Sequence, residues 1–195
     1  PVEYQLDGIK QIQVNAKIGL TFAAVLRSIL RLDPDIILVG EIRDRETAET
    51  AAQSALTGHL VFSTLHTNDT ATAVTRLIDM GVDPYLVAST VIGVFAQRLV
   101  RRLCPDCRVQ ECEGDNSWHA PGCRHCDYSG FRGRVGIYEL LLISDDTRKL
   151  IMEGRSSAEI QQHARDNGMI TILEDGLIKV EQGLTTRDEV FRVGH

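Results

Sequence analysis

Two short apolar runs that end in polar side chains stand out in the first third of the chain. Residues 36–39 are followed by Gly40 and Glu41, and residues 60–65 are followed by His66. Uninterrupted apolar runs of this length are typical of strands buried in a parallel sheet. Because ligands bind beyond the carboxyl ends of such strands, the pattern predicts a ligand site that includes Glu41 and His66.

Helical spacing of apolar residues separates and follows these strands. It predicts helices over residues 21–33, 46–56, 70–80 and from 84 onward, after a short alternating strand over residues 9–14. Asp44 is a suitable N-cap for the second helix, and Gly58 is a suitable left-handed residue at its end. The alternation of strands and helices predicts an α/β fold in which helices cover a parallel sheet.

The second half of the chain has a different pattern. Residues 134–142 are expected to form a strand that returns from a cysteine-rich segment, and the acidic remainder is expected to be helical. Capping-box pairs occur there at Ser156/Glu159, Thr171/Glu174 and Thr186/Glu189. We therefore expect four parts that pack together: an α/β core over residues 1–103, a cysteine module over 104–126, a return strand within 127–143 and a helical subdomain over 144–195.

Four of the five cysteines fall into two CxxC pairs, which is the spacing of metal ligands. Fifteen residues separate Cys104/Cys107 from Cys123/Cys126, and four thiolates satisfy tetrahedral Zn²⁺ with no open coordination position. The metal is therefore expected to be structural, and the compartment reducing. The alternatives are a substitute ligand from His119, His125 or Cys112, or a pair of metal-free redox turns.

Composition and charge restrict the class of function. The chain is 43% hydrophobic, which is ample for a packed core, and its net charge of −6 argues against a dedicated nucleic-acid binder. No apolar run approaches the roughly 18 residues of a membrane span. Seven arginines against five acids over residues 98–134 leave a local positive excess, which would contact anionic lipid or form a solvated, salt-bridged face.

Glu41 is the leading candidate for catalysis. An acid at the end of a buried strand can polarise an attacking water or hold Mg²⁺ beside a transferring phosphoryl group. Arg43 is a neighbouring candidate for binding the same ligand, and His66 could contact a γ-phosphate. The alternative for Glu41 is a turn carboxylate paired with Arg43 or Arg45. Glu3 is a second, less supported candidate acid.

His59 lies at the opposite end of the strand from His66. The two side chains are expected to point to opposite faces, so they do not form a metal-binding pair. His59 suits a structural or intersubunit hydrogen bond, and both histidines could instead be ordinary turn residues.

Taken in order, these motifs resemble the secretion ATPases that drive type II secretion and type IV pilus assembly. Residues 1–3 resemble the end of the family's aspartate box, LRSILRLDPDIILVGEIRD its Walker B segment, and TGHLVFSTLHTND its histidine box. QRLVRRLCPDC, the second CxxC and GFRGRVGIYELL resemble its tetracysteine zinc module. The resemblance covers essentially the whole chain, and such an ordered series of motifs is highly specific.

The resemblance implies the C-terminal half of a RecA-like ATPase domain with a zinc-binding insert and a helical tail. It implies catalytic roles for Glu41, Glu3 and His66, nucleotide contacts for His59 and Arg43, ATP with Mg²⁺, and Zn²⁺ on the four paired cysteines. Family members form hexameric rings in the cytoplasm, peripherally associated with the inner membrane. They drive pseudopilin or pilin assembly through a membrane platform protein, and no nucleic-acid partner is expected.

One expected motif is missing, because no GxxxxGK[ST] phosphate loop occurs in the 195 residues. Since residues 1–4 also resemble neither a signal peptide nor a natural start, we expect a fragment of a longer cytosolic protein, with little ATP binding of its own. The tetracysteine module argues against the pilus-retraction branch. The compact cysteine insert and the ending DGLIKVEQGLTTRDEVFRV favour secretion over pilus extension.

Three rival interpretations make different predictions. A zinc-ribbon module that binds nucleic acid or protein would show salt-sensitive affinity for DNA if nucleic acid were its partner. A ring helicase would carry a basic channel, which this acidic chain does not indicate. A zinc hydrolase is disfavoured because four thiolates leave no coordination position for water.

Overall fold

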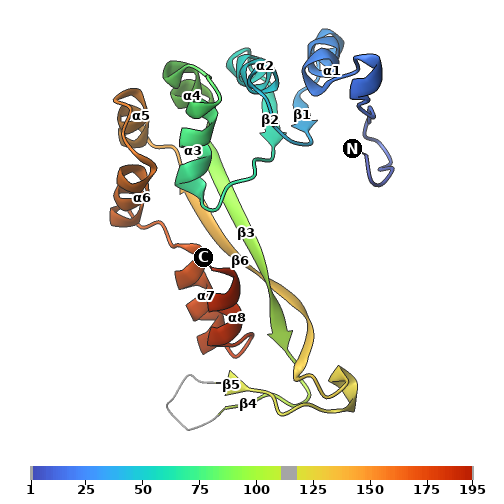
Figure 1. Cartoon of the computed structure of the whole chain (residues 1–195), viewed down its shortest axis with the longest axis vertical. Coiled ribbons are helices and arrows are strands. Elements are labelled where there is room, and N and C mark those ends of the chain that lie inside the picture. Colours follow the sequence, from blue (N-terminus) through green and yellow to red (C-terminus); the bar gives the residue numbers. More distant parts are fainter. Residues whose placement is uncertain (1, 111–117, 195) are drawn as a thin grey trace. The chain divides into compact units, whose positions relative to one another are not determined.

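The computed structural model describes residues 2–110 and 118–194, which form two compact units (Figure 1). Unit 1 takes the chain up to Thr67, then Ala71–Ile92 and Ile143–Ile160. Unit 2 takes Asn68–Thr70, Gly93–Leu142 and the chain from Gln161 onward. The fold is α/β, as the order of apolar runs predicts, but the described strands form one two-stranded sheet in unit 1 and two in unit 2.

Unit 1 is built on two parallel strands, β1 (Ile36–Val39) and β2 (Leu60–Ser63), and this pairing confirms the predicted parallel arrangement. Helices α1 (Phe22–Ile29) and α2 (Arg45–Leu56) pack against the strands. The core between them contains Leu26, Ile37, Val39 and Ala51.

The strands are buried on one face only, which differs from the expectation of strands enclosed by the sheet and its helices. On β1, Ile37 is 4% exposed whereas the alternate residue Leu38 is 75% exposed. Ile36 and Phe62 are also exposed. The described residues place α1 and α2 on one face, so an apolar run that suits burial on both faces retains an open apolar surface.

The helix boundaries in unit 1 follow the predicted capping signals. Asp44 accepts a hydrogen bond from the Thr47 backbone N–H at 2.8 Å and starts α2. After α2 the chain turns at Gly58, whose φ of 103° is favourable only for glycine. Asp83 caps α4 (Pro84–Thr90) with Pro84 at the first helical position.

The remaining helices of unit 1 lie farther along the chain. They are most of α3 (Thr70–Asp79), α4, α5 (Asp145–Met152) and the start of α6 (Ser157–Asp166). Helix α4 packs on both α2 and α5. Arg148 of α5 also donates from Nε to the carbonyl oxygen of Ala88 at 2.9 Å, which fixes α5 against α4.

The expected strand over residues 9–14 is wrong. The segment has no ladder partner among the described residues, and side-chain amides satisfy its neighbouring backbone groups instead. Gln11 Oε1 accepts from the Leu6 N–H at 2.8 Å, and Gln13 Oε1 accepts from the Val2 N–H at 2.7 Å. The alternating polarity of residues 9–14 therefore does not lead to strand pairing in the described structure.

Unit 2 is built on a long antiparallel pair, β3 (Gly93–Leu103) and β6 (Phe131–Leu142). Helices α7 (Ile172–Glu181) and α8 (Arg187–Val193) lie along this pair (Figure 1) and pack around Val100 and Ile137. A short pair, β4 (Val109–Gln110) and β5 (Trp118–His119), joins the cysteine module. The strand over 134–142 is confirmed, but its antiparallel partner β3 was not predicted.

Two of the three predicted capping boxes are present. Thr171 and Glu174 exchange both bonds at the start of α7, and Ser156 and Glu159 do the same. The box at Thr186 and Glu189 is only half formed, because the buried Glu189 carboxylate accepts from Arg101 and Arg192 instead. The Glu189 side chain is therefore a tertiary anchor of α8 on β3 rather than a cap.

Unit 2 is expected to lose stability in acid through Glu189. Hydrogen bonds from Arg101 and Arg192 lower the pKa of this carboxyl to about 2, against about 4.5 in the unfolded chain. Because the folded pKa is the lower one, the stabilisation is present above about pH 4.5 and is lost as pH falls towards 2. We expect Glu189→Gln to lower the free energy of unfolding by about 2 kcal/mol at pH 7. Denaturant unfolding of both proteins at several pH values measures this gap, and a gap that stays constant down to pH 2 would contradict the assignment.

Candidate functional site

The carboxyl ends of β1 and β2 are joined by two hydrogen bonds. The Ile42 backbone N–H donates to the Thr64 carbonyl oxygen at 3.0 Å, and the Thr64 hydroxyl donates to the Gly40 carbonyl oxygen at 2.7 Å. These bonds extend the parallel pairing beyond the strands themselves. The segments that carry Glu41 and His66 are thus held side by side.

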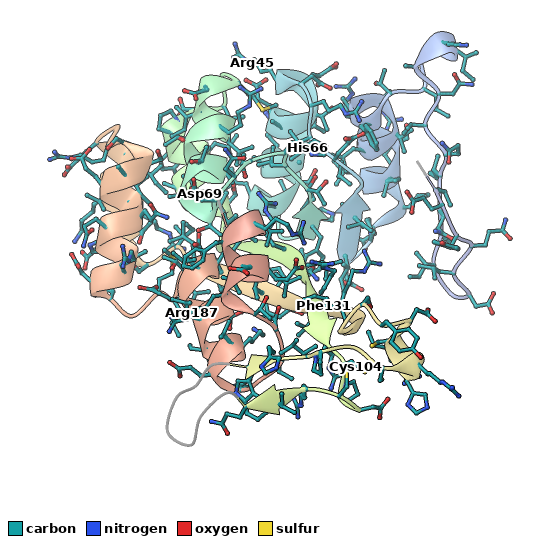
Figure 2. All side chains as sticks on the ribbon, turned by 60° about the horizontal axis from the view of Figure 1, so that its bottom comes forward. Arg45, His66, Asp69, Cys104, Phe131 and Arg187 are labelled. Carbon is teal, nitrogen blue, oxygen red and sulfur yellow. The ribbon has the colours of Figure 1, made fainter. Side chains whose placement is uncertain are left out.

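Glu41 lies at the centre of this edge, between a cation and an imidazole. Its Oε2 accepts from Arg43 Nε at 2.7 Å and lies 3.4 Å from His66 Nε2. The Glu41 side chain is 14% exposed, whereas that of His66, labelled in Figure 2, is 82% exposed. The structure therefore brings together Glu41, Arg43 and His66, three of the residues that the sequence nominated.

The electrostatics of the edge favour the ionised form of Glu41. The hydrogen bond from Arg43 lowers the pKa of the Glu41 carboxyl, against the opposing effect of burial, and the interaction with His66 lowers it further. An ionised carboxylate can accept a hydrogen bond from water or from a ligand group that carries a proton. Arg45 pairs with Glu49 at 2.8 Å. Of the two arginines considered as ion-pair partners of Glu41, only Arg43 therefore contacts it.

The other two candidates of this group lie apart from Glu41. His59 Nδ1 hydrogen-bonds the Ser54 carbonyl oxygen at 2.9 Å, at the end of α2 and the opposite end of β2. That bond fits the structural role considered for His59. Glu3 is exposed in the N-terminal segment, and no hydrogen bond or ion pair among the described residues joins it to Glu41 or His66.

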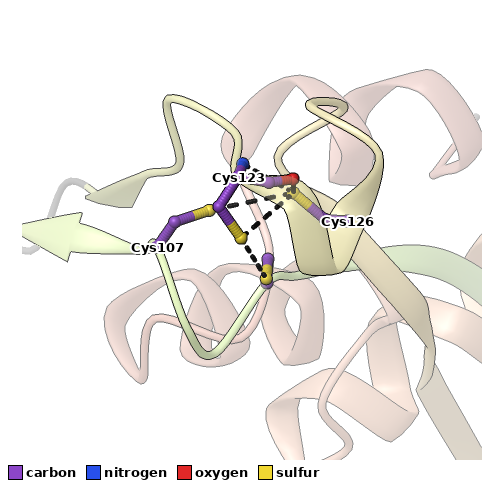
Figure 3. A group of neighbouring side chains, drawn as sticks. Cys107, Cys123 and Cys126 are labelled. Carbon is purple, nitrogen blue, oxygen red and sulfur yellow. Dashed lines mark hydrogen bonds between the residues drawn. The ribbon is translucent and has the colours of Figure 1, made fainter.

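The four paired cysteines form a compact cluster in unit 2 (Figure 3). All four sulfur atoms lie within 4.8 Å of one another. The Sγ atoms of Cys104 and Cys123 are 3.9 Å apart, as are those of Cys107 and Cys126. None of the four is in a disulfide, and Cys104 and Cys126 are buried.

This geometry fits a tetrahedral metal. Ligands at the Zn–S distance of about 2.3 Å have sulfur atoms about 3.8 Å apart, close to the separations in the cluster. The backbone N–H of Cys123 donates to the Cys126 Sγ at 3.1 Å and lowers the pKa of that thiol to about 7, whereas burial raises the pKa of Cys107 to about 12. A cation is the simplest way to hold all four as thiolates.

The alternative ligands are not in the cluster that the structure describes. His125 Nδ1 lies 3.0 Å from the Asp106 carboxylate, which also contacts Arg132 at 3.4 Å. His119 lies in β5, paired with Val109. Cys112 lies outside the described residues.

One notable residue was missed by sequence reasoning. Glu139 lies in the apolar stretch of β6, where Ile137, Glu139 and Leu141 alternate on the buried face. An acid at a core position of a strand was the signal that could have identified it, because such a group requires several hydrogen-bond partners.

Over 89% of this chain the fold matches the solved structure of the pilus retraction motor PilT with bound ADP, with a TM-score of 0.66, 32% identity and coverage of 43% of that structure. The fold is therefore similar to that of this class of motor protein. The family model described as Type II/IV secretion system protein matches residues 1–192, so the chain belongs to this family.

Two similar relatives come from different systems, one from type II secretion and one from type IV pilus assembly. The chain is 56% identical to the type II secretion system protein HxcR of Pseudomonas aeruginosa over 99% of its length. It is 50% identical to the type IV pilus assembly ATPase PilB of Thermus thermophilus over 98% of its length. It spans only 40% of HxcR and 23% of PilB. None of the helices that the structure describes has the length and apolar character of a membrane span.

Proposed function

We propose that the full-length protein couples ATP hydrolysis to type II protein secretion through pseudopilus assembly. The observation that carries the proposal is Glu41, a nearly buried carboxylate that follows a parallel strand and lies 3.4 Å from His66. The family membership and the 56% identity to HxcR give this carboxylate its context. A carboxylate at the end of such a strand is the expected position for phosphoryl-transfer chemistry.

Each residue of the edge has a separate task in this proposal. Glu41 orients the attacking water and accepts its proton, while Arg43 holds the carboxylate ionised until the nucleotide arrives. His66 is exposed, and its imidazole would contact the γ-phosphate of the nucleotide. Mg²⁺, held through its water shell by Glu41, would neutralise charge on the transferring group. Glu3 is proposed as an additional acid of the intact site. His59, at the opposite end of β2 from His66, is proposed as a nucleotide contact across a subunit boundary.

The four paired cysteines are proposed to hold structural Zn²⁺ within residues 104–126. Four thiolates complete the coordination sphere, so the ion would take no part in hydrolysis. The ion would fix the segment that connects the end of β3 at Leu103 to the start of β6 at Phe131.

The assembly is proposed to be a hexameric ring in the cytoplasm at the inner membrane, bound to the platform protein and other secretion components. The local arginine excess of residues 98–134 would allow contact with anionic lipid, and no nucleic acid takes part. The core of residues 1–103 would be the C-terminal half of a RecA-like domain. The phosphate loop would lie elsewhere in the full-length protein, so residues 1–195 alone would hydrolyse ATP very slowly.

The alternative is a type IV pilus assembly ATPase, which the 50% identity to PilB favours. Deleting the gene and complementing it with the wild-type or Glu41→Gln form separates the two. Loss of exported proteins with pili intact supports secretion, whereas loss of surface pili with export intact supports pilus assembly. Purified full-length protein that shows no Mg²⁺-dependent ATP hydrolysis would overturn both.

A further inference from the structure

Glu139 is a buried carboxylate that joins three hydrogen-bond donors from two helix starts. The residue is 3% exposed. Its Oε1 accepts from both the backbone N–H of Thr70, at 3.1 Å, and the Thr70 hydroxyl. Its Oε2 accepts from the backbone N–H of Ile172 at 3.3 Å. Thr70 is the first residue of α3 and Ile172 is the first residue of α7, so one side chain binds the first residue of each of two helices.

A charged side chain at this buried position lowers the stability of the fold unless other groups compensate for it. Burying a carboxylate is unfavourable, and the hydrogen bonds and the positive ends of two helices offset that cost. Helix α7 already has a complete local capping box from Thr171 and Glu174, so its start does not depend on Glu139 alone. The distinctive contact of Glu139 is therefore the pair of hydrogen bonds that it accepts from Thr70.

The segment that Glu139 holds is the direct continuation of the candidate site. Only three residues separate His66 from Thr70 along the chain. Residues Asn68–Thr70 belong to unit 2, although the residues on either side of them belong to unit 1. Figure 2 labels His66 and Asp69 in this stretch of the chain.

A second strand residue holds the same segment. Arg98 Nη2 donates to the Asn68 carbonyl oxygen at 3.3 Å. Arg98 lies in β3 opposite Ile137, and Glu139 lies opposite Ala96, so the two charged residues are diagonal neighbours on one face of the pair. Arg98 of β3 and Glu139 of β6 thus both form hydrogen bonds with the chain shortly after His66.

We propose that Glu139 is a positioning residue for ATP hydrolysis: by holding Thr70, four residues after His66, it restricts the path of the chain segment that carries His66. The proposal rests on the proposed function. Small displacements at such a site have large effects on rate.

The test is ATP hydrolysis by full-length protein over a range of ATP concentrations. We expect Glu139→Gln to lower kcat about tenfold with KM changed less than about twofold, because positioning acts on the transition state. Thr70→Val, which removes only the hydroxyl donor, should lower kcat about threefold, and Thr70→Ser should restore it. Glu189→Gln is the matched control: Glu189 is equally buried in unit 2 and anchors α8, so its loss should lower stability without lowering kcat.

A double-variant cycle distinguishes positioning from general damage. If Glu139 acts through His66, Glu139→Gln combined with His66→Ala should be no slower than His66→Ala alone, within about twofold. Additive losses, or equal losses of kcat in Glu139→Gln and Glu189→Gln, would overturn the inference and leave the proposed function intact. Full activity in Glu41→Gln would instead remove the proposed function. Should Glu139→Gln not fold, the Thr70 variants in the same cycle decide.

Discussion

Glu41→Gln in the full-length protein is expected to lower kcat for ATP hydrolysis at least about 100-fold while leaving ATP binding within about threefold. The amide keeps the shape and the hydrogen-bonding reach of the carboxylate. It cannot accept a proton from water, and it brings no charge to the Mg²⁺ shell. Steady-state hydrolysis and equilibrium binding of a fluorescent ATP analogue measure the two effects separately.

A neighbouring ion pair provides the control for that substitution. Glu49 in α2 is held by Arg45 at 2.8 Å, just as Glu41 is held by Arg43 at 2.7 Å. Only Glu41 lies at the carboxyl end of β1. Glu49→Gln should therefore leave kcat unchanged, and equal losses in the two variants would show that the ion pairs, rather than the position of the acid, determine the rate.

The parts of the fold that were predictable are those set by local chemistry. Helix α2 is an example: Asp44 caps it, an alanine-rich run fills it, and Gly58 turns the chain after it, all within a short stretch of sequence. The apolar runs of β1 and β2 similarly predict a parallel pair, because each run is too short and too apolar to be an exposed helix.

The parts that were not predictable depend on partners distant in sequence. Strand β3 carries Arg98 and Arg101 among its apolar residues, so its pattern resembles a polar connection until β6 pairs with it. Glu189 fits a capping box by spacing, and only the approach of Arg101 shows its actual partners. The segment 9–14 alternates like a strand but has no neighbour to pair with in the described structure.

The same distinction applies to the candidate site. Glu41 and His66 were predictable because the ends of parallel strands lie at one edge of a sheet. The cysteine cluster was predictable because CxxC spacing fixes two ligands at a time. Glu139 was not predicted, because its role depends on Thr70 and Ile172, which lie far from it in sequence and approach it only in the fold.

Removing the proposed metal from the cysteine cluster is expected to lower the stability of unit 2 strongly. Without a cation, the pKa of about 12 for Cys107 leaves that thiol protonated at neutral pH, and four sulfur atoms within 4.8 Å lose the bonds that hold them together. Structural zinc contributes on the order of 10 kcal/mol to folding in small modules. We therefore expect one zinc per chain by metal analysis, and a fall in melting temperature of at least about 10 °C with a strong chelator or in Cys126→Ser.

The fifth cysteine supplies the matched control for this experiment. Cys112 belongs to neither CxxC pair, so Cys112→Ser should retain its zinc and melt within about 2 °C of the wild type. If Cys112→Ser lost the metal while Cys126→Ser kept it, the ligand set would be wrong. If neither variant changed zinc content or melting temperature, the cluster would hold no structural ion. The cysteine segment between β3 and β6 would then be held by its other contacts. These include the hydrogen bond from Arg108 Nη1 to the Gly183 carbonyl oxygen at 2.6 Å, whereas the Asp106 contacts with His125 and Arg132 are largely exposed and correspondingly weak.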